Sequence, residues 1–199
     1  MAEHTRGFFP EQYIPRWLEV YAGPMRSGKS SEIHNRFAKL DPAGIGYLRF
    51  QPSMNERDEG DNITTRNRGT FEATKITDPY EVFDYLGGSI EEDGVKVVGF
   101  DEAQFFPRSI EEVVERLLLQ ERNVVVAGLD LDSDRQPFGS MGHFMEHADY
   151  VKKLHAVCEG CGEWPARYTH FKGEKKGQVV VGDDVYSVLC RACYHDRRG

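Results

Sequence analysis

Long apolar runs are missing from this sequence of 199 residues. None approaches the ~20 residues that a membrane-spanning helix needs, and the start, MAEHTRGFFPEQYIP, holds no apolar core of signal-peptide length. Basic residues are in the minority, since 25 Lys and Arg stand against 33 Asp and Glu and give a net charge of −8. A duplex nucleic acid needs a basic face. We therefore expect a soluble cytoplasmic protein that binds neither a membrane nor nucleic acid.

Cysteine is scarce as well. The four cysteines all lie in the last quarter of the chain, at Cys158, Cys161, Cys190 and Cys193. A secreted disulfide scaffold would spread its cysteines through a short chain, whereas these form two CxxC pairs. Four thiolates can close a tetrahedral zinc site that keeps no open position. We expect structural Zn²⁺ here; a redox-active CxxC is the alternative, and the presence of two pairs disfavours it.

The remaining sequence has the patterns of alternating strands and helices. With 39% hydrophobic residues the chain is long enough for one good-sized domain and a small appendage. A polar stretch without periodicity, residues 51–70, predicts a mobile loop. The expected strands are residues 17–22, 44–50, 95–106 and 123–132, and the expected helices are residues 29–40, 78–88 and 109–122.

Strands that are apolar throughout and alternate with helices predict an α/β fold with a parallel sheet covered on both faces. Ligands of such sheets bind at the carboxyl ends of the strands. Residues 23–30 contain the glycine-rich pattern GxxxxGK[ST], which is typical of phosphate-binding loops. We therefore expect an N-terminal arm (1–15), a nucleotide-binding domain of the P-loop NTPase type (16–150), and a small zinc-ribbon-like domain (151–199) in which two strands flank a loop.

The first strand leads into GPMRSGKS, in which Gly23, Gly28, Lys29 and Ser30 meet the pattern GxxxxGK[ST]. The glycines let backbone N–H groups wrap an anion, the lysine adds a positive charge, and the serine hydroxyl reaches Mg²⁺. The helix that begins there directs its positive end at the phosphates. A polar Gly/Ser turn is the alternative, but the strand before and the helix after favour a phosphate loop.

Two carboxylates end the strand in VVGFDEAQFF, at Asp101 and Glu102. In P-loop enzymes an aspartate at this position helps to hold Mg²⁺. A second carboxylate can accept the hydroxyl proton when a phosphoryl group passes to an alcohol. Alternatively, the two carboxylates are simply solvated charges at the end of a strand, but the neighbouring phosphate loop disfavours this interpretation.

From about Trp17 to Tyr194 the chain resembles the zinc-containing, usually tetrameric (type II) thymidine kinases. The resemblance rests on five segments in the order and spacing of that family: GPMRSGKSSE, DEAQFFP, GLDLDSDRQPFG, KLHAVCEGC and VYSVLCRACY. It implies ATP as phosphoryl donor, Mg²⁺, structural Zn²⁺, a pyrimidine deoxynucleoside as acceptor and a homotetramer.

The resemblance also implies roles for residues. Glu102 would be the general base for the nucleoside 5′-hydroxyl, Ser30 and Asp101 would contact Mg²⁺, and a loop of the zinc domain would fold over the nucleoside. ATP and its phosphates are expected at Gly23, Met25, Arg26, Ser27, Gly28, Lys29, Ser30, Arg57, Asp101, Glu102, Gln104 and Arg135. The nucleoside is expected at Met25, Phe105, Leu129, Ser133, Thr169, Val181, Gly182 and Tyr186.

Three positions depart from the family pattern. Ser133 replaces a phenylalanine that stacks on thymine, Asn55 replaces an aspartate that contacts Mg²⁺, and Arg26 replaces a P-loop phenylalanine. A base–aromatic stack contributes roughly 1–3 kcal/mol to binding, so its loss should weaken nucleoside binding by that amount. Candidates to compensate for the missing ring are Phe105, Phe106, Phe138 and Tyr168.

The sequence therefore predicts an ATP-dependent kinase that makes a deoxynucleoside 5′-monophosphate, with thymidine as the leading substrate, in DNA precursor salvage. One alternative is a P-loop ATPase whose zinc ribbon binds DNA or protein. Another is a nucleotide-binding regulatory homologue with weakened kinase activity, which the changes at Ser133 and Asn55 would favour.

Overall fold

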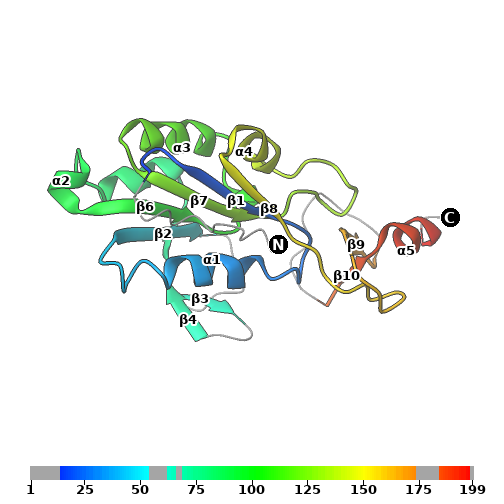
Figure 1. The fold of residues 1–199 in the computed structure, drawn as a ribbon. Helices are drawn as coiled ribbons and strands as arrows, with labels where there is room; N and C mark the ends of the chain where they lie inside the picture. The colour runs from blue at the N-terminus through cyan, green and yellow to red at the C-terminus, as the bar shows by residue number, and fades with distance from the viewer. Residues whose placement is uncertain (1–13, 54–61, 66–68, 174–183, 198–199) are drawn as a thin grey trace.

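The centre of the molecule is a six-stranded sheet in the order β5-β2-β6-β7-β1-β8, in which all neighbouring strands are parallel (Figure 1). This computed structural model describes residues 14–53, 62–65, 69–173 and 184–197. The strands of the sheet are β1 (Leu18–Ala22), β2 (Gly46–Pro52), β5 (Thr74–Ile76), β6 (Val95–Phe100), β7 (Asn123–Gly128) and β8 (Tyr150–Lys153). The predicted parallel α/β fold is confirmed.

Helices cover both faces of this sheet (Figure 1). On one face lie α3 (Ile110–Leu119) and α4 (Met141–His147), and on the other lies α1 (Lys29–Phe37). None of the helices in the described part of the chain is long and apolar enough to cross a membrane.

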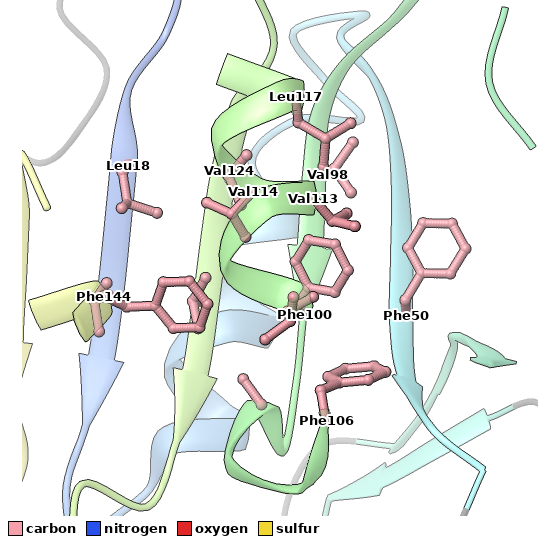
Figure 2. Packing of buried hydrophobic residues seen from close by; sticks show 14 of the residues in the cluster. Leu18, Phe50, Val98, Phe100, Phe106, Val113, Val114, Leu117, Val124 and Phe144 are labelled. Carbon is pink, nitrogen blue, oxygen red and sulfur yellow. The ribbon is translucent and has the colours of Figure 1, made fainter. Parts of the chain in front are cut away.

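The core has two layers because successive side chains of a strand point to opposite faces. In β7, Val124 and Val126 pack toward α3, whereas Val125 and Ala127 pack toward α1. Figure 2 shows the first layer, with Val113, Val114 and Leu117 of α3 among the side chains of the central strands and Phe144 of α4 beside them. Burial on both faces explains why the central strands are apolar throughout.

The helix predicted over residues 78–88 was wrong in type and length. The chain instead forms a 3₁₀ helix, η1 (Pro79–Asp84), and then a single α-helical turn, α2 (Ile90–Asp93). A capping box begins η1: Asp78 accepts from the Tyr80 N–H at 3.0 Å, and Glu81 accepts from the Asp78 N–H at 2.7 Å. The capping box stabilises the start of η1, and Gly87 and Gly88, which have low helix propensity, follow its end.

The loop predicted over residues 51–70 was wrong in part. Strand β2 continues to Pro52, and β3 (Asn62–Thr65) pairs antiparallel with β4 (Gly69–Glu72). Mostly polar strands such as these carry no apolar run that a pattern search would detect. Residues 54–61 and 66–68, and with them Asn55 and Arg57, lie outside the described part of the chain.

The chain continues the sheet past residue 150, where the nucleotide-binding domain was predicted to end. Strand β8 pairs with β1 at the edge of the sheet, and its side chains are mostly exposed, so it lacks the apolar pattern of the inner strands. Beyond it, β9 (Tyr168–Phe171) and β10 (Tyr186–Leu189) pair antiparallel, and α5 (Arg191–Asp196) follows. The two strands expected between the cysteine pairs are confirmed. Residues 155–173 and 184–197 are called the four-cysteine module below.

A buried ion pair fastens the turn before β6 to the start of β7. Arg122 is fully buried and binds both carboxylate oxygens of Asp93, at 3.0 and 2.8 Å, and the carbonyl of Gly87 at 3.1 Å. Burial of the Asp93 carboxyl opposes its ionisation. Hydrogen bonds from Arg122 and from the backbone N–H groups of Val95 and Gly87 outweigh that effect and hold the pKa of Asp93 below its ordinary value.

Asp93→Asn should lower the free energy of unfolding at pH 7 by about 3 kcal/mol, because it leaves the Arg122 charge buried without its counter-ion. Since the folded-state pKa of Asp93 is lowered, this stabilisation is present above the unfolded-state pKa of about 4. It is lost as the pH falls through the folded-state pKa. Urea unfolding at a series of pH values should show the difference between wild type and variant shrinking in acid.

The control for this substitution is Glu121→Gln, which breaks the exposed pair with Arg16. We expect it to change the free energy of unfolding by less than about 0.5 kcal/mol. Equal effects of the two substitutions would contradict the role given to the buried pair.

Candidate functional site

The glycine loop, residues 23–30, joins β1 to α1 at the carboxyl edge of the sheet. Gly28 is the N-cap of α1 and has φ 87°, in the left-handed region that glycine adopts without strain. The turn therefore leads directly into the amino end of a nine-residue helix, where free backbone N–H groups favour an anion.

Two side chains of the loop fit a bound phosphate. Buried Lys29 donates from Nζ to the Pro24 carbonyl at 2.8 Å, which holds its ammonium group within the loop. The Ser27 hydroxyl is buried without a hydrogen-bond partner among the described residues. A buried hydroxyl in that state costs free energy, and an anion in the loop would supply the missing acceptor. Ser30 is half-buried in the first turn of α1.

The acidic pair lies at the end of β6, separated from β1 in the sheet only by β7. Asp101 is buried and accepts from the Glu102 N–H at 2.8 Å. Glu102 has φ 50°, a conformation that is uncommon for a residue with a side chain. Strained backbone of this kind is concentrated at functional sites.

Gln104 holds the Glu102 carboxylate in place. Its Nε2 donates to Glu102 Oε2 at 2.6 Å, and its Oε1 accepts from the Leu129 N–H at 2.9 Å. The backbone after β7 must approach closely, because a Cβ at Gly128 would lie 2.6 Å from Gln104 Oε1. Sequence analysis placed Gln104 among the phosphate-binding residues; the structure places it between the acidic pair and the loop after β7.

That loop, residues 129–140, carries two of the residues predicted to bind the nucleoside, Leu129 and Ser133. Asp132 shapes it by accepting from the N–H groups of Asp134 and Gln136 at 2.8 and 2.9 Å. Ser133 is buried, and its hydroxyl has no partner among the described residues. Half-buried Phe138 packs edge-on against Phe105, with ring centroids 5.4 Å apart.

Of the rings that could compensate for Ser133, two are committed elsewhere. Phe106 is in the core against Phe100. Tyr168 is buried beneath the guanidinium groups of Arg135 and Arg191, at 5.9 and 5.5 Å. Phe105 and Phe138 therefore form the aromatic pair that is left beside Leu129 and Glu102.

The four cysteines come together as the sequence predicted, with their sulfur atoms all within 4.8 Å of one another. Burial opposes ionisation of Cys158, but backbone N–H groups of Cys190, Cys161 and Gly160 lower the pKa of its thiol to about 6. Hydrogen bonds with Cys190 and Cys161 raise the pKa of Cys193 to about 12. Four sulfur donors this close fit a divalent metal such as Zn²⁺, which would bind them as thiolates and displace their protons.

The four-cysteine module contacts both the glycine loop and the loop after β7. The Met25 N–H donates to Thr169 Oγ1 of β9 at 3.1 Å, and Arg26 forms an ion pair with Glu159. On the other side, the Tyr194 hydroxyl donates to the Ser133 carbonyl at 2.7 Å. A small core that includes Tyr168, Val188 and Tyr194 packs against Met25 and Leu131. The module therefore joins the glycine loop to the loop after β7.

Two further predicted site residues belong to or contact the four-cysteine module, and the carbonyl of one of them, Tyr186, accepts from Arg26 Nη1 of the glycine loop at 3.5 Å. The Arg135 guanidinium lies over the Tyr194 ring at 5.2 Å, and Tyr186 is buried against Phe171. Val181 and Gly182, expected to read the base edge, lie outside the described residues, as does the segment 174–183 of the expected covering loop.

Sequence analysis missed Tyr194 and Glu159. Tyr194 directly follows the last cysteine in CRACY, and Glu159 directly follows the first in CEG. Their contact partners are far away in sequence: Ser133 is 61 residues from Tyr194, and Arg26 is 133 residues from Glu159. The sequence therefore offered one signal for a role of these two residues, their position beside a predicted metal-ligand cysteine.

A glycine loop between a buried strand and a helix, with acids at the end of a nearby parallel strand, defines a P-loop-like α/β protein, here with a four-cysteine module. The thymidine kinase family model matches residues 16–194, nearly the whole of this chain. The chain therefore belongs to the thymidine kinase family.

Individual relatives agree with this assignment. A thymidine kinase of Rhodothermus sp. is 33% identical over 183 residues, which are 92% of this chain and 83% of that protein. One of Porphyromonas gingivalis is 35% identical over 178 residues, 89% of this chain and 84% of that protein. One of Bdellovibrio bacteriovorus is 35% identical over 189 residues, 94% of this chain and 85% of that protein.

Proposed function

We propose that this chain transfers the γ-phosphoryl group of ATP to the 5′-hydroxyl of thymidine, in the salvage of DNA precursors. Membership of the thymidine kinase family supports this activity. The observation that carries the chemistry is the pair of hydrogen bonds by which Gln104 ties the Glu102 carboxylate to the loop after β7. They put a candidate base beside the residues predicted to hold the nucleoside.

In this proposal the glycine loop binds the phosphates of ATP. Backbone N–H groups at Gly28 and the start of α1 surround them, and Lys29 leaves the Pro24 carbonyl to neutralise their charge. Ser30 and Asp101, which offer only oxygen donors, would hold Mg²⁺. The ion would offset the negative charge of the phosphoryl oxygens.

Glu102 would accept the proton of the 5′-hydroxyl as that oxygen attacks the γ-phosphorus. Gln104 donates to one carboxylate oxygen, Oε2, and so fixes the orientation of the carboxylate. A base held in this way needs no reorientation when the nucleoside arrives. Gln104 thus acts as a positioning residue.

The four cysteines would hold one structural Zn²⁺, with no open position for chemistry. The ion would neutralise thiolates that otherwise repel one another. The pairs Cys158/Cys161 and Cys190/Cys193 would then fix both ends of the β9–β10 excursion. The homotetramer, the cytoplasmic location and the domain limits given above stay predictions.

The experiment measures monophosphate formation from Mg·ATP with thymidine, deoxyuridine and deoxycytidine. We expect phosphorylation of thymidine, and we expect Glu102→Gln to lower kcat by about 10²–10⁴-fold, the usual contribution of a general base. Glu115→Gln, at an exposed position of α3, is the matched control and should retain wild-type activity.

Two results would overturn the proposal. If Glu102→Gln turned over at the wild-type rate, Glu102 would not be the general base. If the protein hydrolysed ATP without forming any nucleoside monophosphate, it would not be a nucleoside kinase. In the second case, stimulation of hydrolysis by DNA would favour the alternative of an ATPase with a nucleic-acid-binding zinc ribbon.

The base of the nucleoside should contact the Phe105–Phe138 pair, since Ser133 offers no ring. Phe138→Leu should raise KM for thymidine about 10-fold or more, because a base–aromatic stack is worth roughly 1–3 kcal/mol. KM for ATP should not change. Steady-state kinetics with each substrate varied in turn measure both quantities.

Phe83→Leu serves as the control for this substitution. Phe83 is also half-buried, but it lies under Arg116 of α3, with the guanidinium 4.2 Å from the ring centre. Phe83→Leu should leave the KM values for thymidine and for ATP unchanged. If Phe138→Leu behaves in the same way, the ring that binds the base is not on this loop.

A further inference from the structure

Helix α4 carries two histidines one turn apart. The imidazole rings of His143 and His147 stack with their centroids 4.1 Å apart and their planes 29° from parallel. The opposite side of the helix is anchored in the core by Met141 and Phe144. The His143 side chain is 37% exposed and His147 is exposed, so both rings can be reached from solvent.

One nitrogen of each ring already faces a partner. His147 Nδ1 lies 2.9 Å from the His143 carbonyl oxygen, and His143 Nδ1 lies 4.0 Å from Glu111 Oε2. The carbonyl within hydrogen-bonding distance of His147 Nδ1 favours the proton at that nitrogen and leaves the other nitrogen as a lone-pair donor. Glu111 is too far from His143 Nδ1 for a hydrogen bond, but its negative charge favours the proton on that side of the ring. In both histidines this donor is Nε2.

The Glu111 carboxylate is itself held in position. Ser140, the N-cap residue of α4, donates from Oγ to Glu111 Oε1 at 2.7 Å. Oε2 is the oxygen that faces His143. Two histidines at i and i+4 lie on the same face of a helix, a spacing that allows both to bind one metal ion. His147 also has a backbone carbonyl at its Nδ1, as metal-binding histidines commonly do, and the Glu111 carboxylate lies close to His143.

We propose that His143 and His147 chelate a divalent late transition-metal ion, of the Zn²⁺, Ni²⁺ and Cu²⁺ class, through their Nε2 atoms. Imidazole is a preferred ligand of these ions, whereas Mg²⁺ takes oxygen ligands. Water completes the coordination, and Glu111 is a positioning residue that acts through His143. The site shares no residue with the cysteine cluster or with the kinase chemistry proposed above, so it stands or falls independently of both.

Occupation of this site would stabilise α4. The helix has seven residues, too few to be stable without its packing against the sheet. An ion that bridges His143 and His147 binds the helical conformation and not the unfolded chain, so it raises the unfolding temperature. Since α4 begins directly after the loop of residues 129–140, the same ion would fasten one end of that loop.

The test is a titration of the full-length protein with NiCl₂ by calorimetry, after loading with zinc and dialysis. Thermal unfolding with and without nickel is recorded in parallel, and no substrate is present. Wild type should bind one Ni²⁺ per chain and unfold at a higher temperature in its presence. His143→Gln and His147→Gln should each lose most of the affinity and all of the shift.

Two further variants make the test specific. Glu111→Gln keeps an acceptor for Ser140 but weakens the partner of His143, and should lower the affinity about 10–100-fold. His155→Gln changes a histidine that packs on Trp164 and Arg167, and should bind nickel as wild type does. Unchanged nickel binding in both His143→Gln and His147→Gln would overturn the proposal, as would the absence of binding to wild type.

Discussion

The four-cysteine module is held against two loops of the sheet at once, and the arrangement of the site depends on this contact. Met25 of the glycine loop donates to Thr169, and Tyr194 donates to the carbonyl of Ser133 in the loop after β7. The paired strands β1 and β7 fix where the two loops begin, and the module bridges the loops beyond the ends of those strands. A module of this size has little core of its own, and a metal held by four cysteines is the usual means of stabilising one.

The parallel sheet supplies the other half of the geometry. Because all six strands run in the same direction, the glycine loop, the Asp101–Glu102 pair and the loop after β7 emerge at one edge, on three adjacent strands. Gln104 links the acidic pair to the loop after β7 through its hydrogen bonds with Glu102 and Leu129. The rigid edge positions the glycine loop and the acidic pair, and the four-cysteine module contacts the loop predicted to meet the nucleoside.

The sequence was sufficient for features that rest on local pattern. Burial on both faces makes β1, β6 and β7 apolar throughout, so these strands could be predicted from the sequence alone. The GxxxxGK[ST] and paired CxxC motifs could be recognised in the same way because their spacings are fixed. Edge strand β8 was not predicted because its side chains are mostly exposed, and the hairpin β3–β4 was not predicted because its strands are mostly polar. The bond from Tyr194 to Ser133 joins residues 61 apart and depends on how the module docks, for which single-sequence patterns carry no signal.

The most direct test of this account is the steady-state kinetics of Tyr194→Phe, which removes one hydroxyl and keeps the ring in the module. A hydrogen bond is worth about 0.5–1.5 kcal/mol, so we expect KM for thymidine to rise about 2- to 10-fold. KM for ATP, and a bound zinc content of one ion per chain, should not change. An unchanged KM for thymidine would show that the four-cysteine module does not position the loop after β7, and would contradict the account.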